Sequence, residues 1–369
     1  MKKFFFLAVV ALAASAACTK NVTVETPDRA ITFQVANYVP QTKANVAFEG
    51  TAFKTSAWFH ADASAAAQSF MSSDSIKFQS NNTWAADRLY FWPKTGWVNF
   101  FSWAGVPEPA VTEGVAAYGT SSAPLTIAAD ADAMLASAAY RYGSANYDAN
   151  VYTDPILYNS VDTKGVPTLF HHMLAQVNFI VKFDAQDIPS TSGYKWDLII
   201  DEVKLEYGNK GYLTVNFTDP GSTGQAWPFA ANSVNWTCVE NTILSGTMNI
   251  GASNKQTTEA GSISAGKDLY KDLSVLPQVI GNPGTTAKLG IKYTLISYYN
   301  NAKHIEETID LTGVNAIAIA DFTNNTISQW NMNYKYTYTV TIKPNKTVTF
   351  DPAVEAWQTD SAGYTYPND

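Results

Sequence analysis

The residues best suited to chemistry are few and widely spaced. His171 and His172 are adjacent, and on an extended segment adjacent side chains point to opposite faces, which is poor geometry for sharing a metal ion. His304, in the sequence HIEET, lacks the second histidine of a zinc-protease helix. We therefore expect no catalytic residues, no metal site and no cofactor.

Acidic residues give no clear site either. Asp130 and Asp132 offer oxygen ligands of the kind that calcium prefers, but two carboxylates in one loop are common and we favour a plain loop. The sequence GSISAG at 261–266 does not fit the G-x-S-x-G turn of a serine hydrolase. A glycoside hydrolase needs two carboxylates at a fixed separation, and no acidic residue stands in a suggestive context.

Cys18 follows a segment with the order of a bacterial secretory signal. Residues 1–17 carry two lysines, then an apolar run, then small residues, and the run is shorter than the roughly 20 residues of a membrane-spanning helix. Residues 15–18, SAAC, are similar to a lipobox, in which the cysteine thiol accepts a diacylglycerol before cleavage; a leucine is commoner at the first position. We predict a signal peptide over 1–17 and lipidation at Cys18, the alternative being an ordinary signal with a cysteine nearby.

The composition suits a strand-rich protein with a substantial core. Hydrophobic residues make up 46% of the 369 residues, aromatic residues 13% and charged residues only 15%. A net charge of -8 without a cluster of Lys or Arg argues against binding nucleic acid. Beyond Cys18 the sole cysteine is Cys238, so no disulfide framework is available, and we expect Cys238 to be a small buried hydrophobe.

Alternating apolar residues predict strands through most of the chain, bounded by Gly, Pro, Asn, Asp and Ser. The expected strands are 31–39, 125–130, 176–183, 196–207, 211–217, 273–280, 289–299 and 334–343. Helical periodicity is nearly absent, and 61–71 and 130–140 are expected to be at most short helices or loops. We predict an all-β protein of two tandem sandwich domains, 18–165 and 166–369, with the boundary near 166.

Tryptophans concentrate in LYFWPKTGWVNFFSWAG, residues 89–105, which contains Trp92, Trp97 and Trp103. Exposed aromatic rings can stack on sugars. Alternation along a strand, however, turns about half of these rings inward, and large aromatics dominate the cores of sandwiches. We favour core packing for this segment.

Five separated motifs occur in a recognisable order: YFWPKTGWVNFFSWAG, DAMLASA, VPTLFHHMLAQVNFIVKF, LSVLPQVI and WNMNYKYTYTVTIKPNKTVTFDPAVEAW. Together the chain from about 30 to 358 resembles the fimbrillins, the type V pilus subunits and fimbrillin-like lipoproteins of Bacteroides-type bacteria. The resemblance implies two transthyretin-like β-sandwich domains, export as a lipoprotein to the outer membrane, and polymerisation by donor-strand exchange. It implies no enzymatic activity.

The expected partners are other pilin subunits, the outer membrane through the lipid anchor, and a trypsin-like protease. Arg29 and Lys43 are the candidate cleavage sites: a cut at Arg29 leaves 31–39 with the subunit, and a cut at Lys43 removes it. The resulting location is the cell surface, in a fimbria that supports adhesion. The alternative function is a non-polymerising or tip lipoprotein that binds glycans or a host protein.

The C-terminal segment 348–366 is the expected donor strand. Val348 and Phe350 alternate with threonines, and Val354 and Trp357 resume the apolar set beyond Pro352. Because proline tolerates only the edge of a ladder or a bulge, the part before Pro352 is expected to finish the second domain and the part after it to reach a neighbour. The alternative is that everything to Trp357 packs within its own sandwich.

Overall fold

The computed structural model describes residues 30–35, 50–62, 64–79, 83–93, 97–105, 108–113, 115–141, 166–168, 170–216, 236–246, 254–280, 287–321 and 327–356. The all-β fold class is confirmed. Besides strands, this part of the chain contains only three short 3-10 helices, η2 (Ser190–Ser192), η3 (Gly313–Asn315) and η4 (Ile319–Asp321). Among the residues described, none forms a helix of the length and hydropathy that crossing a membrane requires.

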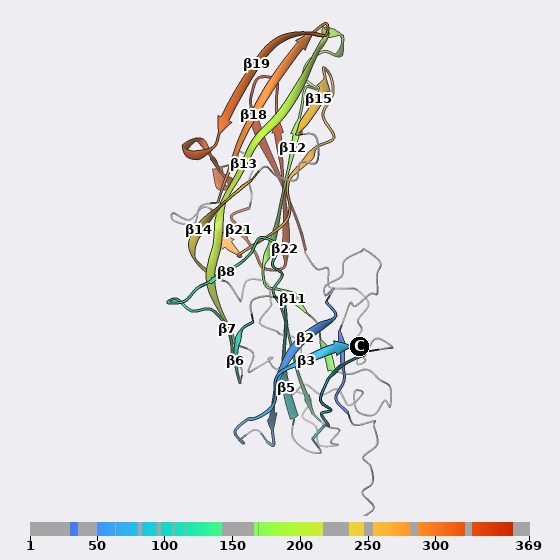
Figure 1. Ribbon diagram of the computed structural model, residues 1–369, viewed down its shortest axis with the longest axis vertical. Helices are drawn as coiled ribbons and strands as arrows, with labels where there is room; N and C mark the ends of the chain where they lie inside the picture. Colours follow the sequence, from blue (N-terminus) through green and yellow to red (C-terminus); the bar gives the residue numbers. More distant parts are fainter. Residues whose placement is uncertain are drawn as a thin grey trace, which may run out of the picture.

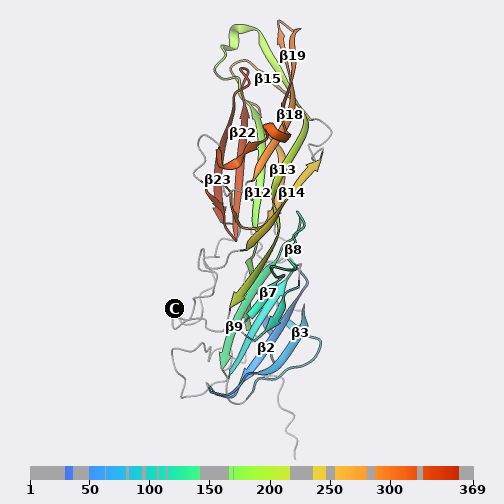
Figure 2. The same ribbon diagram turned by 90° about the vertical axis from the view of Figure 1, so that its left-hand side faces the viewer.

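The molecule is elongated, with the N-terminal strands in its lower half and the C-terminal strands in its upper half (Figures 1 and 2). The lower half is built on an eight-stranded sheet. Its order is β10 (Val166–Thr168), β1 (Phe33–Val35), β4 (Trp84–Ala86), β3 (Gln68–Phe78), β2 (Ala52–His60), β5 (Trp97–Ala104), β9 (Met134–Arg141) and β11 (His171–His172).

Two sheets pack face to face in the upper half, and the second of them extends into the lower half (Figure 1). One has the order β16 (Lys267–Val275), β12 (Ala175–Phe183), β22 (Tyr334–Ile342) and β23 (Val348–Ala356). The other has the order β19 (Ala302–Leu311), β18 (Lys288–Tyr299), β13 (Tyr194–Asn216), β7 (Val115–Tyr118) and β6 (Ala110–Thr112), with β8 (Leu125–Thr126), β14 (Thr237–Gly246), β15 (Lys255–Glu259) and β20 (Ile317–Ala318) paired alongside. This second sheet reaches the lower half through β13, and β7 and β6 lie there (Figure 1). A small ribbon joins β17 (Gln278–Val279) to β21 (Gln329–Trp330).

Strand β13 corrects one expectation, because it runs without a break from Tyr194 to Asn216, where two separate strands were expected, and joins the two halves (Figure 1). The sequence GNKG at 208–211 forms a bulge against β14 instead of a turn. Gln278 bridges the bulge, accepting the Gly208 N–H and donating to the Gly208 carbonyl, each at 3.0 Å. A side chain at Gly208 would meet Cys238 Sγ at 2.0 Å, so close packing explains the glycine.

The expectation of short helices or loops at 61–71 and 130–140 is also wrong in part. β3 begins at Gln68 and β9 begins at Met134. Met134 and Ala136 face one core and Leu135 faces another, so both faces are buried at the start of β9. A strand buried on both faces shows no alternation of polar and apolar residues, which is why the pattern was missed.

The described residues form three hydrophobic cores. One is formed by side chains of the eight-stranded sheet, and one lies between the two sheets of the upper half. The third joins the halves through Phe101, Trp103, Leu213 and Val215. Core packing of the aromatic segment is confirmed for Phe101 and Trp103, whereas the side chain of Trp97 lies outside the described residues.

The boundary near 166 stays a prediction. Strands β10 and β11 follow that position in sequence but pair with β1 and β9 of the N-terminal sheet. The far end of β13 pairs with β7. Residues on both sides of 166 therefore contribute to the lower half of the molecule.

Candidate strand-exchange site

Strand β1 is inserted between two others instead of lying at an edge. Phe33 pairs with Val166 of β10 in parallel and with Trp84 of β4 in antiparallel orientation. The Val166 N–H donates to the Thr32 carbonyl at 2.7 Å. The nitrogen of Pro167, the next residue, lies on the side of β10 away from β1, as suits an edge strand. The ladder is short because β1 has only three residues, of which Phe33 alone pairs with β4.

Side chains hold β1 more firmly than its ladder does. Ile31, Phe33 and Val35 are exposed by 5%, 1% and 5%, and all three belong to the N-terminal core. The Phe33 ring meets Phe53 and Phe100 edge to face, with centroids 5.8 and 5.6 Å apart. Burial of each such side chain stabilises by roughly 1.5–3 kcal/mol. Loss of β1 would leave an apolar slot flanked by unpaired backbone groups of β10 and β4.

A second contact to this strand was missed by the sequence analysis. The Ile31 N–H donates to the Tyr90 carbonyl at 2.8 Å, and Ala30 forms an antiparallel bridge with Phe91. Tyr90 in turn donates its hydroxyl to Asp74 Oδ2 at 2.8 Å. Burial, together with this hydrogen bond and the charge of Asp74, raises the pKa of Tyr90. No sequence signal links positions 74 and 90, because the β3–β4 pairing that brings them together is a tertiary feature.

The described part of the expected donor segment, Val348–Ala356, forms β23, the edge strand of the four-stranded sheet. Pro352 pairs opposite Tyr338, and pairing with β22 continues past it to Ala356. The edge position of the proline is as expected, but it does not divide the segment into a paired and a free part. At an edge its missing N–H can face away from the ladder.

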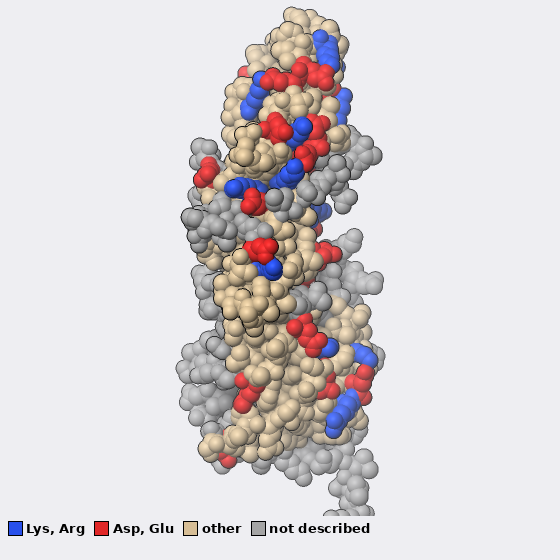
Figure 3. All heavy atoms as spheres, turned by 60° about the vertical axis from the view of Figure 1, so that its left-hand side comes forward, with Lys and Arg blue, Asp and Glu red and all other residues tan. Residues whose placement is uncertain are grey.

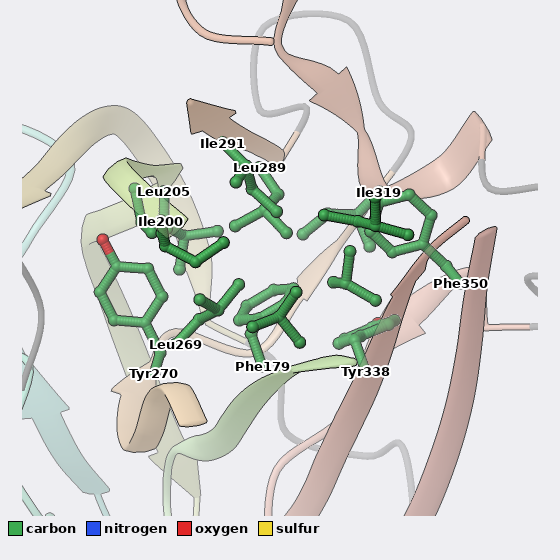
Figure 4. Close-up of a cluster of buried hydrophobic side chains, with 14 of the residues drawn as sticks. Phe179, Ile200, Leu205, Leu269, Tyr270, Leu289, Ile291, Ile319, Tyr338 and Phe350 are labelled. Carbon is green, nitrogen blue, oxygen red and sulfur yellow. The ribbon is translucent and has the colours of Figure 1, made fainter. Parts of the chain in front are cut away.

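The four donor residues differ in their surroundings. Phe350 is 5% exposed and packs in the core of the upper half, where it lies beside Ile319 (Figure 4). Val348 is half-buried against the same core. Val354 is 50% exposed, and Trp357 lies outside the described residues, as do Cys18, Arg29 and Lys43. In sequence, β1 lies between Arg29 and Lys43.

Among the residues first considered for chemistry, His172 and Asp132 are in contact. The ring of His172, which is 3% exposed, is hydrogen-bonded through Nδ1 to Asp132 Oδ1 at 2.7 Å, while the side chain of His171 lies outside the described residues. Within the described ranges, no group of three or more His, Cys, Asp or Glu side chains is placed to hold a metal ion. Cys238 is a free cysteine packed against the third core, the one that joins the two halves, and burial raises the pKa of its thiol.

Charges on the face drawn in Figure 3 are mixed, with acidic and basic side chains side by side. Lys77 pairs with Asp87 at 2.6 Å, and Lys210 pairs with Glu240 at 2.7 Å. The described residues on this face form no extended basic stripe of the kind that follows a phosphate backbone.

Comparison with known proteins gives structural matches, while no family model and no curated protein matches the chain. A candidate cell adhesion protein from Bacteroides uniformis is 14% identical, with 90% of this chain and 100% of that one covered and a TM-score of 0.42. A candidate cell adhesion protein from Parabacteroides distasonis is 12% identical (89% and 99% covered, TM-score 0.42). The fimbrial anchor protein Mfa2 from Porphyromonas gingivalis is 12% identical (89% and 98% covered, TM-score 0.30).

These matches are described as adhesion and fimbrial proteins, the class that the sequence resemblance indicated. Because their TM-scores are below 0.5, no functional argument rests on them.

Proposed function

We propose that this chain is a structural subunit of a cell-surface fimbria that supports adhesion, and that it has no enzymatic activity. The observation that carries the proposal is the position of β1. Its buried side chains Ile31, Phe33 and Val35 fill an internal slot, and the strand lies in sequence between two candidate protease sites. A strand so placed can be removed by a cut on its C-terminal side.

Strand exchange follows from that geometry. A cut at Lys43 would detach β1 from the subunit, whereas a cut at Arg29 would remove only the segment before it. The emptied slot would present unpaired backbone groups and apolar pockets, which a strand from another copy can fill. Since donor and slot lie on different parts of the chain, the contact is head to tail and repeats into a filament.

The donor strand comes from the C-terminal segment. Val348 and Phe350 have the alternation that the slot requires, but they already pack against their own core, and truncating a buried Phe costs about 3–5 kcal/mol. We therefore place the donor at Trp357 and at Val354, which is 50% exposed and would have to leave its pairing with Tyr336. Val354 and Trp357 are three positions apart, so on a regular strand their side chains point to opposite faces. For both to fill pockets on one face, the strand needs a bulge between them.

The lipid anchor at Cys18 is expected on the precursor and not on the processed subunit. We propose that Cys18 is acylated and holds the precursor at the outer membrane until a trypsin-like protease releases the subunit. Changing Cys18 to Ala should leave unprocessed precursor without palmitate label. Continued labelling of that variant would contradict the lipid anchor but not the strand exchange.

The test is limited trypsin digestion of the purified mature protein. We expect trimming at one site followed by ladders that resist detergent, and N-terminal sequencing of the assembled material should give Ala44 if β1 is removed. A start at Ala30 would show that β1 stays with the subunit and that exchange occurs elsewhere. Trimming without any ladder, together with no difference in surface filaments between cells with and without the gene, would favour a non-polymerising surface lipoprotein.

A further inference from the structure

We propose that residues 87–92, the latch segment, hold the N-terminal end of β1 closed, and that the hydrogen bond from Tyr90 to Asp74 keeps this latch shut against proteolysis after Arg29. The inference rests on the proposed function, because a cut after Arg29 would release the subunit from its anchor at Cys18; removal of β1 itself requires the cut at Lys43. It states that opening of the latch segment exposes the bond after Arg29.

The latch segment contacts β1 separately from strand β4. Beyond the pairing of Phe33 with Trp84 the chain loops outward, leaving Leu89 67% exposed, and then returns to pair with Ala30 and Ile31. The residues directly after Arg29 are therefore bound to the fold. Ile31 has its side chain buried and its N–H bonded to Tyr90.

A protease binds several residues on both sides of the bond that it cuts, in an extended conformation with free backbone groups. Ala30 and Ile31 cannot meet that requirement while they pair with Phe91 and Tyr90. Cleavage after Arg29 must therefore wait for local opening of the latch segment. Its rate then reports the population of the open form when opening and closing are fast.

Several contacts fasten the latch segment to β3. Tyr90 donates its hydroxyl to Asp74 at 2.8 Å, and its ring lies 5.6 Å from the Phe70 ring. Within the latch segment itself, the Arg88 guanidinium lies 5.3 Å from the centre of the Tyr90 ring. Lys77 binds Asp87 at 2.6 Å, an exposed pair that is worth little by itself. Tyr90 is the residue on which most of these contacts converge.

The backbone of β3 is shaped to present Asp74. Its pairing with β2 shifts register between Asp74 and Met71, and Ser73 has a φ of 50°, an uncommon value for a residue other than glycine. The Ser73 N–H is bonded to Ser56 Oγ at 2.9 Å, and the Ser72 N–H to Asp74 Oδ2 at 3.0 Å. A bulge of this kind redirects a side chain, here toward Tyr90.

The experiment compares trypsin cleavage after Arg29 in the mature wild-type chain and in Tyr90→Phe, measured as the rate of appearance of the fragment beginning at Ala30. We expect cleavage to be about tenfold faster in Tyr90→Phe, the factor that follows from losing one hydrogen bond to a carboxylate. The double variant Tyr90→Phe/Asp74→Ala should be no faster than Asp74→Ala alone, because both changes remove the same bond.

A matched control lies in the upper half of the molecule. The Tyr298 hydroxyl donates to Asp197 Oδ2 at 2.9 Å, so Tyr298→Phe loses an equivalent bond far from β1 in the fold. This variant should be cut after Arg29 at the wild-type rate. Equal rates for Tyr90→Phe and wild type would overturn the latch, and so would an equal acceleration by Tyr298→Phe, since cleavage would then follow general unfolding.

Failure of the latch and failure of the proposed function give different results. Faster cleavage of Tyr90→Phe without filaments in any variant would support the latch and contradict the fimbrial subunit. Filaments from a Tyr90→Phe variant that is cut at the wild-type rate would contradict the latch and support the fimbrial subunit.

Discussion

The Phe33 ring meets the Phe100 ring edge to face, with 5.6 Å between centroids. This contact joins β1, one of the shortest strands of the N-terminal sheet, to β5, a strand buried on both faces. Phe33 is the aromatic member of the three buried side chains, with Ile31 and Val35, that attach this segment to the core. If β1 is removed and replaced as we propose, the incoming strand must supply an equivalent ring.

Replacing Phe33 with Ala should lower the free energy of unfolding by about 3–5 kcal/mol, the usual effect of deleting a buried aromatic ring. Chemical unfolding followed by tryptophan fluorescence measures it. Thr32→Ala is the control, since Thr32 is outside the core and should change stability by less than about 1 kcal/mol. Similar losses in the two variants would mean that the backbone, and not the Phe33 ring, holds β1.

A second prediction concerns the close packing around Gly208, in the strand that joins the two halves. A Cβ at position 208 would lie 2.0 Å from Cys238 Sγ and 2.8 Å from Gln278 Oε1, so Gly208→Ala should destabilise by about 1–3 kcal/mol through overpacking. Removing the sulfur should relieve part of the clash. Gly208→Ala/Cys238→Ala should therefore be less destabilised than the sum of the two single variants. If the losses in free energy of unfolding of the two single variants simply added in the double variant, the packing explanation would be contradicted.

The sequence predicts where the strands of this fold lie better than it predicts where each strand begins and ends. Alternation correctly located β12, β18 and β22, because each buries one face and shows the other to a more polar environment. It failed at β13, where two glycines suggested a turn, because the bulge is stabilised by Gln278, a residue distant in sequence. It failed at β9 because small apolar residues buried on both faces have no period.

The candidate site was predictable only in part. The apolar alternation of Ile31, Phe33 and Val35 is visible in sequence and locates the strand that fills the slot. Its neighbours β10 and β4 and the contact to Tyr90 depend on pairings between distant segments, one of them parallel. Nothing local in the sequence reports such pairings.

Acid should selectively weaken the pairing of β13 with β15 and β18 around Asp197. Burial would raise the pKa of this carboxyl, but hydrogen bonds from Lys255, Thr257 and Tyr298 together outweigh it and hold the pKa below its usual value. Because the folded-state pKa is lowered, the stabilisation is present above the unfolded value of about 4 and is lost as pH falls through the folded value.

Asp197→Asn should therefore lower the free energy of unfolding at pH 7 by about 1–3 kcal/mol. The gap between this variant and wild type should narrow as the pH falls below about 4, because wild type then loses the same interaction. Urea unfolding at several pH values measures the gap. Asp201→Asn is the control, since Asp201 is exposed and accepts one hydrogen bond, from Thr294. A gap that stays constant with pH would contradict the role of the Asp197 charge.

Two C-terminal truncations test the donor strand. Deleting 357–369 leaves all of β23 and should give a folded protein of unchanged stability. Deleting 353–369 also removes the pairing of Val354 with Tyr336 and of Ala356 with Tyr334, and should cost roughly 1–3 kcal/mol at about 0.5–1.5 kcal/mol per hydrogen bond. Since Phe350 remains in its core, both proteins should fold, as thermal unfolding will show.

Neither truncated protein should form detergent-resistant ladders after trypsin, because each lacks Trp357, which we expect to enter the slot of the next subunit. Ladders from the shorter deletion but not from the longer one would place the donor at Val354 alone. Ladders from both would show that the residues after Pro352 are not the donor. In that case the only remaining C-terminal candidates, Val348 and Phe350, would have to leave their own core, and Phe350→Ala should then abolish assembly in protein that still folds.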